Sequence, residues 1–210
     1  ADWPLSRLVP QPLGKALGDA LAEGGVSLHL GQSVSRIERN GEALTVETST
    51  GDSIQVDIVL SAVGLAPRTT LASAAGLNCH RGIVVDDHLA TSAADVYALG
   101  DCAEVNGYVL PYIMPTTHAA RALAATLAGE TTRLNWPAMP VAVKTPMCPT
   151  IVCPPQSASG SWSSIEGEGR DLTAIFTDDA GQPNGFALTG AATKRRGELT
   201  KLMPPLLQSG

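Results

Sequence analysis

A short apolar run that ends in a glycine and an aspartate constrains the fold of this chain more than any other feature. Val96 to Leu99 is apolar, Gly100 follows it directly, and Asp101 then supplies a carboxylate. An apolar run of this length between turn-forming residues is typical of a buried strand in a parallel sheet. Open α/β sheets bind ligands just beyond the carboxyl ends of such strands, and Gly100 permits a close approach there. Asp101 is therefore a candidate for binding sugar-like hydroxyl groups.

The same residues also fit a strand followed by an aspartate that caps a helix, and the glycine–aspartate pair alone favours that plainer interpretation. The wider stretch from Thr91 to Asp101 resembles the second flavin motif of the two-dinucleotide-binding flavoprotein reductases. The segment from Asp57 to Thr69 resembles the crossover by which such chains leave the NAD(P)H domain and re-enter the FAD domain. The two motifs follow the family's order and usual separation. The resemblance implies that Asp101 binds the ribityl chain of FAD.

Within that family, the segments Gly100–Val105 and Met139–Pro146 are most similar to the bacterial rubredoxin–NAD reductases. The general resemblance covers residues 11–130, and the specific one extends it to the C-terminus. It implies an enzyme that passes electrons from NADH or NADPH through FAD to rubredoxin, in support of an oxygenase such as alkane hydroxylase. The alternatives among enzymes are a ferredoxin reductase component and the flavin subunit of a nitrite reductase.

The resemblance implies further cofactor contacts besides Gly100 and Asp101. Ile113 lies where the family places a main-chain contact to the flavin, so its side chain carries little information. Lys144 matches a lysine that approaches the flavin, where a cation would stabilise the reduced, anionic ring. An exposed lysine on an edge strand is the plainer alternative. No catalytic side chain is expected, because positioning and electrostatics suffice for flavin chemistry of this kind.

The chain contains no Gly-x-Gly-x-x-Gly loop, although the family uses two of them to bind dinucleotide pyrophosphates at helix N-termini. It also lacks a starting methionine. We therefore expect the C-terminal part of a longer protein, in which the choice between NADH and NADPH is made upstream. The competing class is no enzyme at all, but an inactive fragment or interaction piece without the cofactor loops.

Composition bears on the partners and the compartment. The chain has 210 residues and a net charge of −6, so no basic excess indicates nucleic-acid binding. No apolar run reaches the length that spans a membrane. Four cysteines without a regular spacing favour a reducing, cytoplasmic compartment. A monomer is expected, although the sequence does not determine the oligomeric state.

Cysteine and histidine positions predict neither a disulfide nor a metal centre. Cys148 and Cys153 lie in an extended, proline-flanked stretch that holds their Cα atoms too far apart for a disulfide, so we interpret both as buried structural thiols. Cys102 is expected to pack rather than react. The four histidines do not cluster, and no metal ligand set is expected.

A basic cluster, Lys194, Arg195 and Arg196, occurs near the start of the last predicted helix. Such a cluster is usually a solvated helix face. Rubredoxins are small and acidic, so a basic patch near the flavin would steer one toward it by long-range attraction.

Periodicity and turn residues divide the chain into three expected domains. Residues 1–64 are assigned to the end of an NAD(P)H-binding domain, residues 65–130 to the second segment of an FAD-binding domain, and residues 131–210 to a small C-terminal domain. In the first two, the expected helices are 11–24, 70–75 and 116–128, and the expected strands are 26–30, 34–37, 44–48, 54–60, 82–86 and 96–99. The Asn40–Gly41 pair predicts a hairpin turn.

The C-terminal domain is expected to mix strands with one helix. The expected strands are 141–143, 151–153, 172–176 and 186–189, with a Ser/Gly-rich hairpin within 156–169 and a helix over 191–203. The predicted fold class is thus α/β and α+β. It comprises the C-terminal parts of two Rossmann-like nucleotide-binding domains, followed by a small α+β domain.

Overall fold

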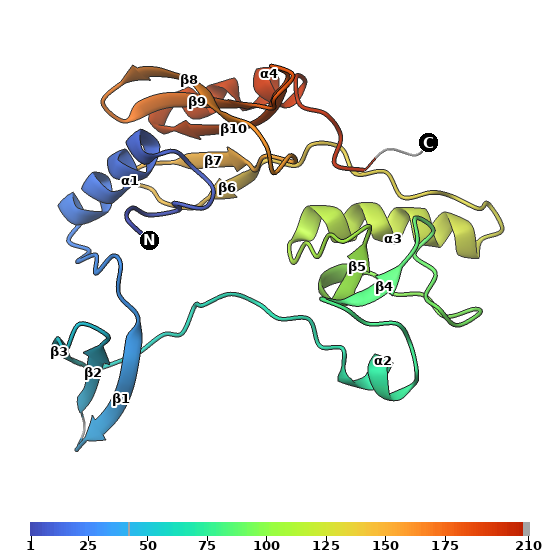
Figure 1. Cartoon of the computed structure of the whole chain (residues 1–210), viewed down its shortest axis with the longest axis horizontal. Helices are drawn as coiled ribbons and strands as arrows, with labels where there is room; N and C mark the ends of the chain where they lie inside the picture. Colours follow the sequence, from blue (N-terminus) through green and yellow to red (C-terminus); the bar gives the residue numbers. More distant parts are fainter. Residues whose placement is uncertain (42, 208–210) are drawn as a thin grey trace. The chain divides into compact units, whose positions relative to one another are not determined.

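The computed structural model of the protein describes residues 1–41 and 43–207. The chain forms two compact units, each assembled from segments that are distant in the sequence. Ala1–Ala62 and Pro140–Met203 form what we call the sheet unit, and Val63–Met139 with the segment that begins at Pro204 forms the central unit. Figure 1 labels the elements of both units. The three-domain division predicted above stays a prediction.

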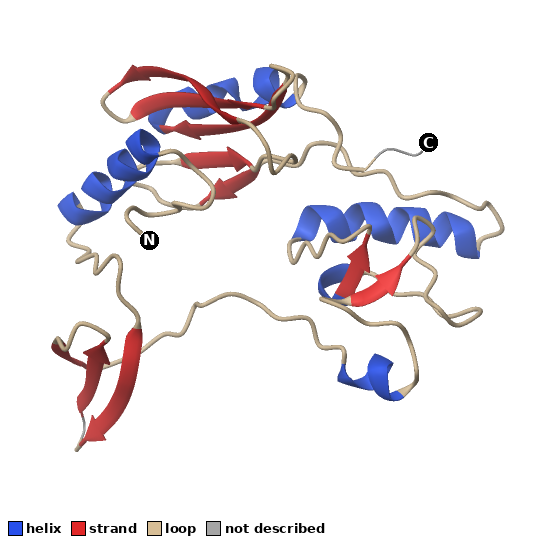
Figure 2. Ribbon diagram, in the orientation of Figure 1, coloured by secondary structure: helices blue, strands red, loops and turns tan. Residues whose placement is uncertain are grey.

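The sheet unit is built on a five-stranded antiparallel sheet (Figure 2). Its strands run in the order β6 (Val141–Val143), β7 (Thr150–Cys153), β10 (Pro183–Thr189), β9 (Asp171–Thr177) and β8 (Ser161–Glu168). The apolar run 186–188 of the central strand β10 is completely buried, as expected for a strand covered on both faces. The four strands predicted for the C-terminal domain are confirmed.

One prediction in this region is wrong, and a second is confirmed only in part. Residues 156–169 do not form a hairpin of their own, because the turn at Gly169 leads β8 directly into its partner β9. The helix expected over 191–203 is a 3₁₀ turn, Gly190–Arg195 (η2), followed by the short helix α4, Arg196–Thr200. Gly190 adopts a left-handed φ of +57°, and Gly197 lowers the helix propensity of the next turn.

Helix α1 (Gln11–Glu23) packs on the sheet rather than standing apart from it. The helix predicted over 11–24 is confirmed, and its buried face shares a core with Val152, Ala174 and Ala187 of three strands. Gly14 is required where the helix meets the N-terminal segment, since a Cβ there would lie 1.9 Å from Cδ1 of Trp3. The Trp3 indole in turn donates a hydrogen bond to the Val9 carbonyl at 3.1 Å.

A three-stranded meander follows α1, with β1 (Val34–Asn40), β2 (Ala43–Thr48) and β3 (Ser53–Val56) paired antiparallel. Asn40 pairs with Ala43, which confirms the predicted hairpin; Glu42 lies outside the described residues. The strand expected over 26–30 is absent from the described residues, where that segment forms a loop.

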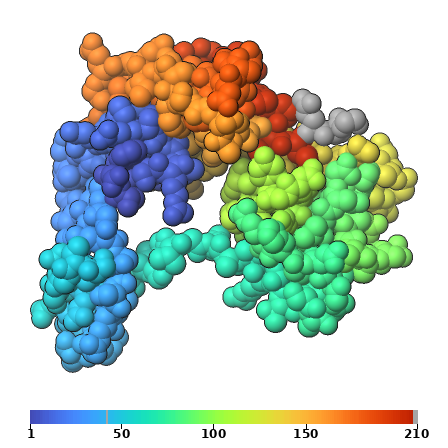
Figure 3. All heavy atoms as spheres, in the orientation of Figure 1, coloured from blue at the N-terminus to red at the C-terminus, as the bar shows by residue number. Residues whose placement is uncertain are grey.

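The strand predicted over 54–60 corresponds to β3, which ends at Val56, so the predicted continuation to Leu60 is wrong. Residues 57–63 form an extended connection drawn as a narrow line of atoms in Figure 3. The side chains of Ile58, Leu60 and Val63 are 83%, 86% and 96% exposed. A buried parallel strand needs a hydrogen-bonded neighbour, and none of the described residues pairs with this segment.

The central unit places the parallel pair β4 (Ile83–Val85) and β5 (Ala103–Val105) against helix α3 (Ile113–Leu127). Helix α2 (Thr70–Ala74) confirms the short helix predicted before β4, and β4 confirms the strand expected there. The core of this unit is formed by residues of β4, β5 and α3 together with residues of the connecting segments, among them Leu89, Leu134 and Trp136.

The apolar run Val96–Leu99 is not the buried strand that the sequence predicts. The run is extended, but among the described residues its β-pairing is limited to an isolated bridge between Tyr97 and Ala90. The strand of this motif is β5, which begins after Asp101 instead of ending before it. The physical reason is local, because the run folds back on the preceding loop through the Ala98 N–H and the Leu89 carbonyl, 3.1 Å apart.

Helix α3 begins at Ile113, three residues before the predicted start. Pro115 is the third helical residue, a position it tolerates because N–H groups of the first turn have no intrahelical acceptor.

Among the described residues, no helix combines the length and apolar character that crossing a bilayer requires.

A buried carboxylate anchors the loop that leads into β4. Glu104 of β5 is 5% exposed and accepts hydrogen bonds from the N–H groups of Arg81 (2.7 Å) and Gly82 (2.9 Å). The Nδ1 atom of His80 lies 3.0 Å from the same carboxylate. These contacts, led by the His80 hydrogen bond, lower the pKa of Glu104 against the opposing effect of its burial.

We expect Glu104→Gln to lower the free energy of unfolding by about 1–3 kcal/mol at neutral pH, because the buried Gly82 N–H and the partly buried Arg81 N–H lose a charged acceptor. A folded-state pKa below the unfolded value contributes stability that is present above the unfolded pKa, near 4.5. That stability is lost as the pH falls through the folded value. Denaturation curves from neutral to acidic pH should therefore show the difference shrinking below about pH 4.5.

The exposed Glu130 of the same unit offers a matched control, and Glu130→Gln should leave the unfolding free energy within about 0.5 kcal/mol of the wild type. A pH-independent difference between the wild type and Glu104→Gln would contradict the electrostatic account.

Candidate functional site

The glycine–aspartate turn is a short 3₁₀ segment, Gly100–Cys102 (η1), that packs against α3. Gly100 has a left-handed φ of +81°, a conformation that a glycine adopts without steric cost. A Cβ on Gly100 would lie 3.7 Å from Cγ2 of Thr116 in α3, so the turn sits close to that helix. The next residue, Asp101, presents its carboxylate to solvent.

The start of α3 is open. Tyr112 precedes the helix in an extended conformation, and no side chain of the described residues caps the first turn. Ile113 is 80% exposed and Met114 about half exposed. Pro115 has no N–H, so the N–H groups of Ile113 and Met114 carry the positive end of the helix dipole.

A pocket of about 350 Å³ lies beside the Asp101 carboxylate. This volume is within the range of small-molecule sites, which combine apolar walls with a few polar groups. Asp101 and Arg68 supply the charges, and the remaining walls come from Leu65, Ala66, Pro67, Cys102, Val109 and Pro111. We did not single out Arg68 from the sequence, although it belongs to the crossover segment 57–69. The signal that could have indicated Arg68 is that the crossover segment and the motif with Asp101 belong to the same family resemblance.

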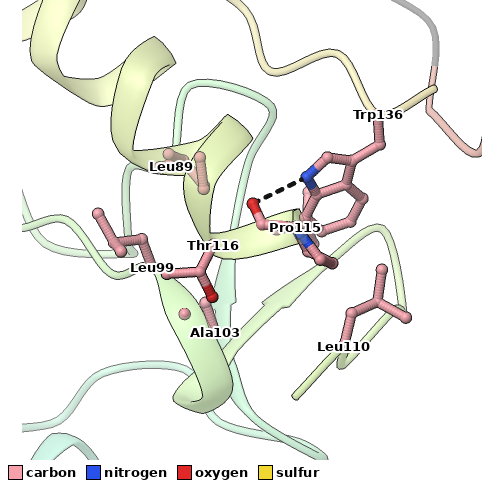
Figure 4. Close-up of a pocket in the computed structure, with 10 residues that line it drawn as sticks. Leu89, Leu99, Ala103, Leu110, Pro115, Thr116 and Trp136 are labelled. Carbon is pink, nitrogen blue, oxygen red and sulfur yellow. Dashed lines mark hydrogen bonds between the residues drawn. The ribbon is translucent and has the colours of Figure 1, made fainter. Parts of the chain in front are cut away.

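A smaller space lies beside the first turn of α3 (Figure 4). It measures about 10 Å³, room for no more than about one water molecule. The indole Nε1 of Trp136 donates a hydrogen bond to the Pro115 carbonyl at 3.3 Å on its border. Leu89, Leu99, Ala103 and Leu110 make the wall apolar, so this space is part of the core that supports the site.

The residues that the sequence predicts to contact the cofactor are found in both units. Gly100, Asp101 and Ile113 all belong to the central unit. Lys144 belongs to the sheet unit, where it is exposed and follows the last residue of the edge strand β6. All four stay predicted cofactor contacts.

The basic cluster is partly neutralised within the sheet unit. Arg195 pairs with Glu198 at 3.1 Å and with Glu166 at 3.6 Å. Arg196 donates a hydrogen bond to the Pro140 carbonyl at 3.4 Å. The cluster is therefore a weaker source of positive potential than three solvated charges.

The four cysteines are free thiols. Cys148 and Cys153 are buried, which confirms the structural interpretation, and burial raises the pKa of Cys153 to about 11. Its thiol is therefore protonated and unreactive near neutral pH.

Asp86, Asp87 and His88 form a cluster that we did not predict from the sequence. Its groups already have protein partners. The Asp86 carboxylate accepts the N–H groups of His88 and Ala90, and Asp87 pairs with the His88 ring and with Arg133. These contacts indicate that the three side chains hold the loop at residues 86–90 in place.

A parallel strand pair, a glycine–aspartate turn and an open helix start are elements of a dinucleotide-binding unit. The chain belongs to the pyridine nucleotide-disulphide oxidoreductase family, whose sequence pattern matches residues 1–124. Residues 133–203 match the pattern of the rubredoxin binding C-terminal domain.

Two curated relatives are the rubredoxin-NAD(+) reductases of Alcanivorax borkumensis, 47% identical over 206 residues, and of Acinetobacter baylyi, 44% identical over 208 residues. Each alignment covers 97% of this chain and 53% of the relative, so the chain spans about half the length of the curated relatives it matches. The crystal structure of a ferredoxin reductase from Rhodopseudomonas palustris is similar, with a TM-score of 0.83 and 25% identity over 97% of this chain and 53% of that chain. The predicted α/β and α+β fold class is confirmed.

Proposed function

We propose that this chain is the C-terminal part of an FAD-dependent reductase that passes electrons from NADH through FAD to rubredoxin. Family membership and the match of the last third to a rubredoxin binding domain support the proposal. One structural observation carries it: the Asp101 carboxylate, the Gly100 turn and the open start of α3 belong to one folded unit. The pocket beside Asp101 extends to Pro111, two residues before that helix.

The residues present fit FAD. In this proposal the Asp101 carboxylate accepts hydrogen bonds from ribityl hydroxyls, and Gly100 allows the close approach. The N–H groups at Ile113 and Met114 face the isoalloxazine ring, where the helix dipole favours negative charge. The family resemblance further implies that Lys144, a residue of the sheet unit, contributes a cation near the bound flavin. When bound, FAD would supply the conversion of a two-electron donor into one-electron deliveries, and this chain's residues would bind and orient it and stabilise its charge.

We place this reductase in the cytoplasm, because its four free cysteines favour a reducing compartment.

We also propose that the reductase acts as a monomer and that its domains meet near residues 64 and 130. The proposed electron donor is NADH rather than NADPH. A one-electron carrier as product is consistent with electron supply to an oxygenase such as alkane hydroxylase. The names of the two curated relatives support the donor.

The proposal predicts that the full gene product reduces rubredoxin with a kcat/KM at least about tenfold higher than that for ferredoxin. A ferredoxin is the second candidate acceptor, because the structurally similar protein described above is a ferredoxin reductase. Both carriers are reduced side by side with NADH and followed by their visible absorbance. A preference for ferredoxin would retain the flavin but exclude rubredoxin as the partner, and reduction of neither by a protein that binds FAD would indicate a different partner for the C-terminal domain.

A further inference from the structure

The segment between α3 and β6 is held against the central unit rather than hanging as a loose linker. The N–H of Leu134 donates to the Asp87 carbonyl at 2.7 Å. Two residues on, Trp136 exchanges backbone hydrogen bonds with Leu207, at 3.0 Å and 3.1 Å. Leu206 and Leu207 also pack against the core that contains Trp136. The chain therefore returns from its C-terminal end to secure this segment.

The Trp136 side chain connects that segment to the start of α3. The indole is 4% exposed, and its Nε1 reaches the carbonyl of Pro115, the third residue of the helix. Figure 4 shows the ring lying beside Pro115 with its nitrogen pointing at that carbonyl. Gly100 and Thr116 border the same small space as Trp136. The indole thus supports the first turn of α3 and borders the same small space as the glycine–aspartate turn.

We propose that Trp136, secured by Leu207, is a positioning residue that sets how strongly the start of α3 stabilises a reduced, negatively charged flavin. The inference rests on the proposed function, in which the isoalloxazine ring faces that helix start. A helix dipole acts on a charge only within its first turn, so a small displacement of this turn changes the interaction. Pro115 gives that turn no N–H, so displacement of the remaining donors has a direct effect.

The test compares the FAD-loaded full gene product with variants Trp136→Phe and Leu207→Pro. The first removes the indole donor but keeps an aromatic ring, and the second removes the N–H that bonds to the Trp136 carbonyl. We expect both to make the two-electron midpoint potential of the flavin more negative. A threefold to tenfold loss in the reduction equilibrium is expected, tenfold being about 30 mV for two electrons.

Trp3→Phe is the matched control, because the Trp3 indole also donates to a backbone carbonyl but lies in the sheet unit. It should leave the potential unchanged. An unchanged potential in Trp136→Phe, even with a lower melting temperature, would overturn the inference and leave Trp136 a purely structural residue. If that variant does not fold, the potential of Leu207→Pro decides in the same way. A wild-type protein that binds no FAD would overturn the proposed function together with the inference.

Discussion

Asp101→Asn is expected to weaken the binding of FAD to the full gene product by about 10- to 150-fold. A hydrogen bond to a charged group contributes about 1.5–3 kcal/mol, and each 1.4 kcal/mol is a factor of ten. Asn keeps the shape of the side chain but replaces a charged acceptor by a neutral amide, which has only one oxygen to accept with. Titration of the apoprotein with FAD, followed by flavin fluorescence, measures the change.

Asp179→Asn is the matched control, because Asp179 is an exposed aspartate in a turn of the sheet unit. It should leave the dissociation constant of FAD unchanged. Circular dichroism of both variants checks that the fold is retained. Equal FAD affinity in Asp101→Asn and the wild type would show that the aspartate caps a turn and does not hold the cofactor.

Leu13→Ala is expected to lower the free energy of unfolding of the sheet unit by about 2–5 kcal/mol, the cost of truncating a buried leucine. Leu13 of α1 is fully buried in a core that includes Val152, Leu172 and Ala187 of the sheet. The cavity left by the truncation would separate a helix from strands that follow it by more than 130 residues. Loss of this contact should therefore destabilise the strands as well as the helix.

Trp162 on β8 packs against the same core and reports on the sheet by its fluorescence. Chemical denaturation followed at this tryptophan, with Trp3 and Trp136 replaced by Phe in a common background, isolates its signal. Lys15→Ala, at an exposed position of the same helix, is the control and should change stability by less than about 0.5 kcal/mol. A transition at Trp162 that Leu13→Ala does not shift would show that α1 and the sheet unfold independently.

Much of the candidate site was predictable from local sequence. Gly100 and Asp101 stand in a motif, and the alanine-rich helix that begins near them is visible from its composition. The role of the neighbouring run Val96–Leu99 was not predictable, because an apolar tetrapeptide fits a buried strand and an extended segment equally well. Which of the two forms depends on where the hydrogen-bond partners of the run lie, and here the Ala98 N–H bonds to the Leu89 carbonyl of the preceding loop.

The contribution of Trp136 lay beyond sequence reasoning for a similar reason. Nothing near it in the sequence indicates the Pro115 carbonyl, 21 residues away, or the backbone of Leu207. Arg68 was visible within a motif, but its place at the Asp101 pocket appears only in three dimensions.

By itself, the sequence determined α1, the Asn40–Gly41 hairpin, four of the five strands of the C-terminal sheet and the turn that begins at Gly100. These features depend on side-chain period and on the conformational freedom of single residues, which are local properties. Only the tertiary structure decided that α1 packs on the distant sheet and that the C-terminal segment secures the start of α3. Such contacts join residues far apart in the chain, and they are selected by complementary shape and by the burial of apolar surface and polar groups together.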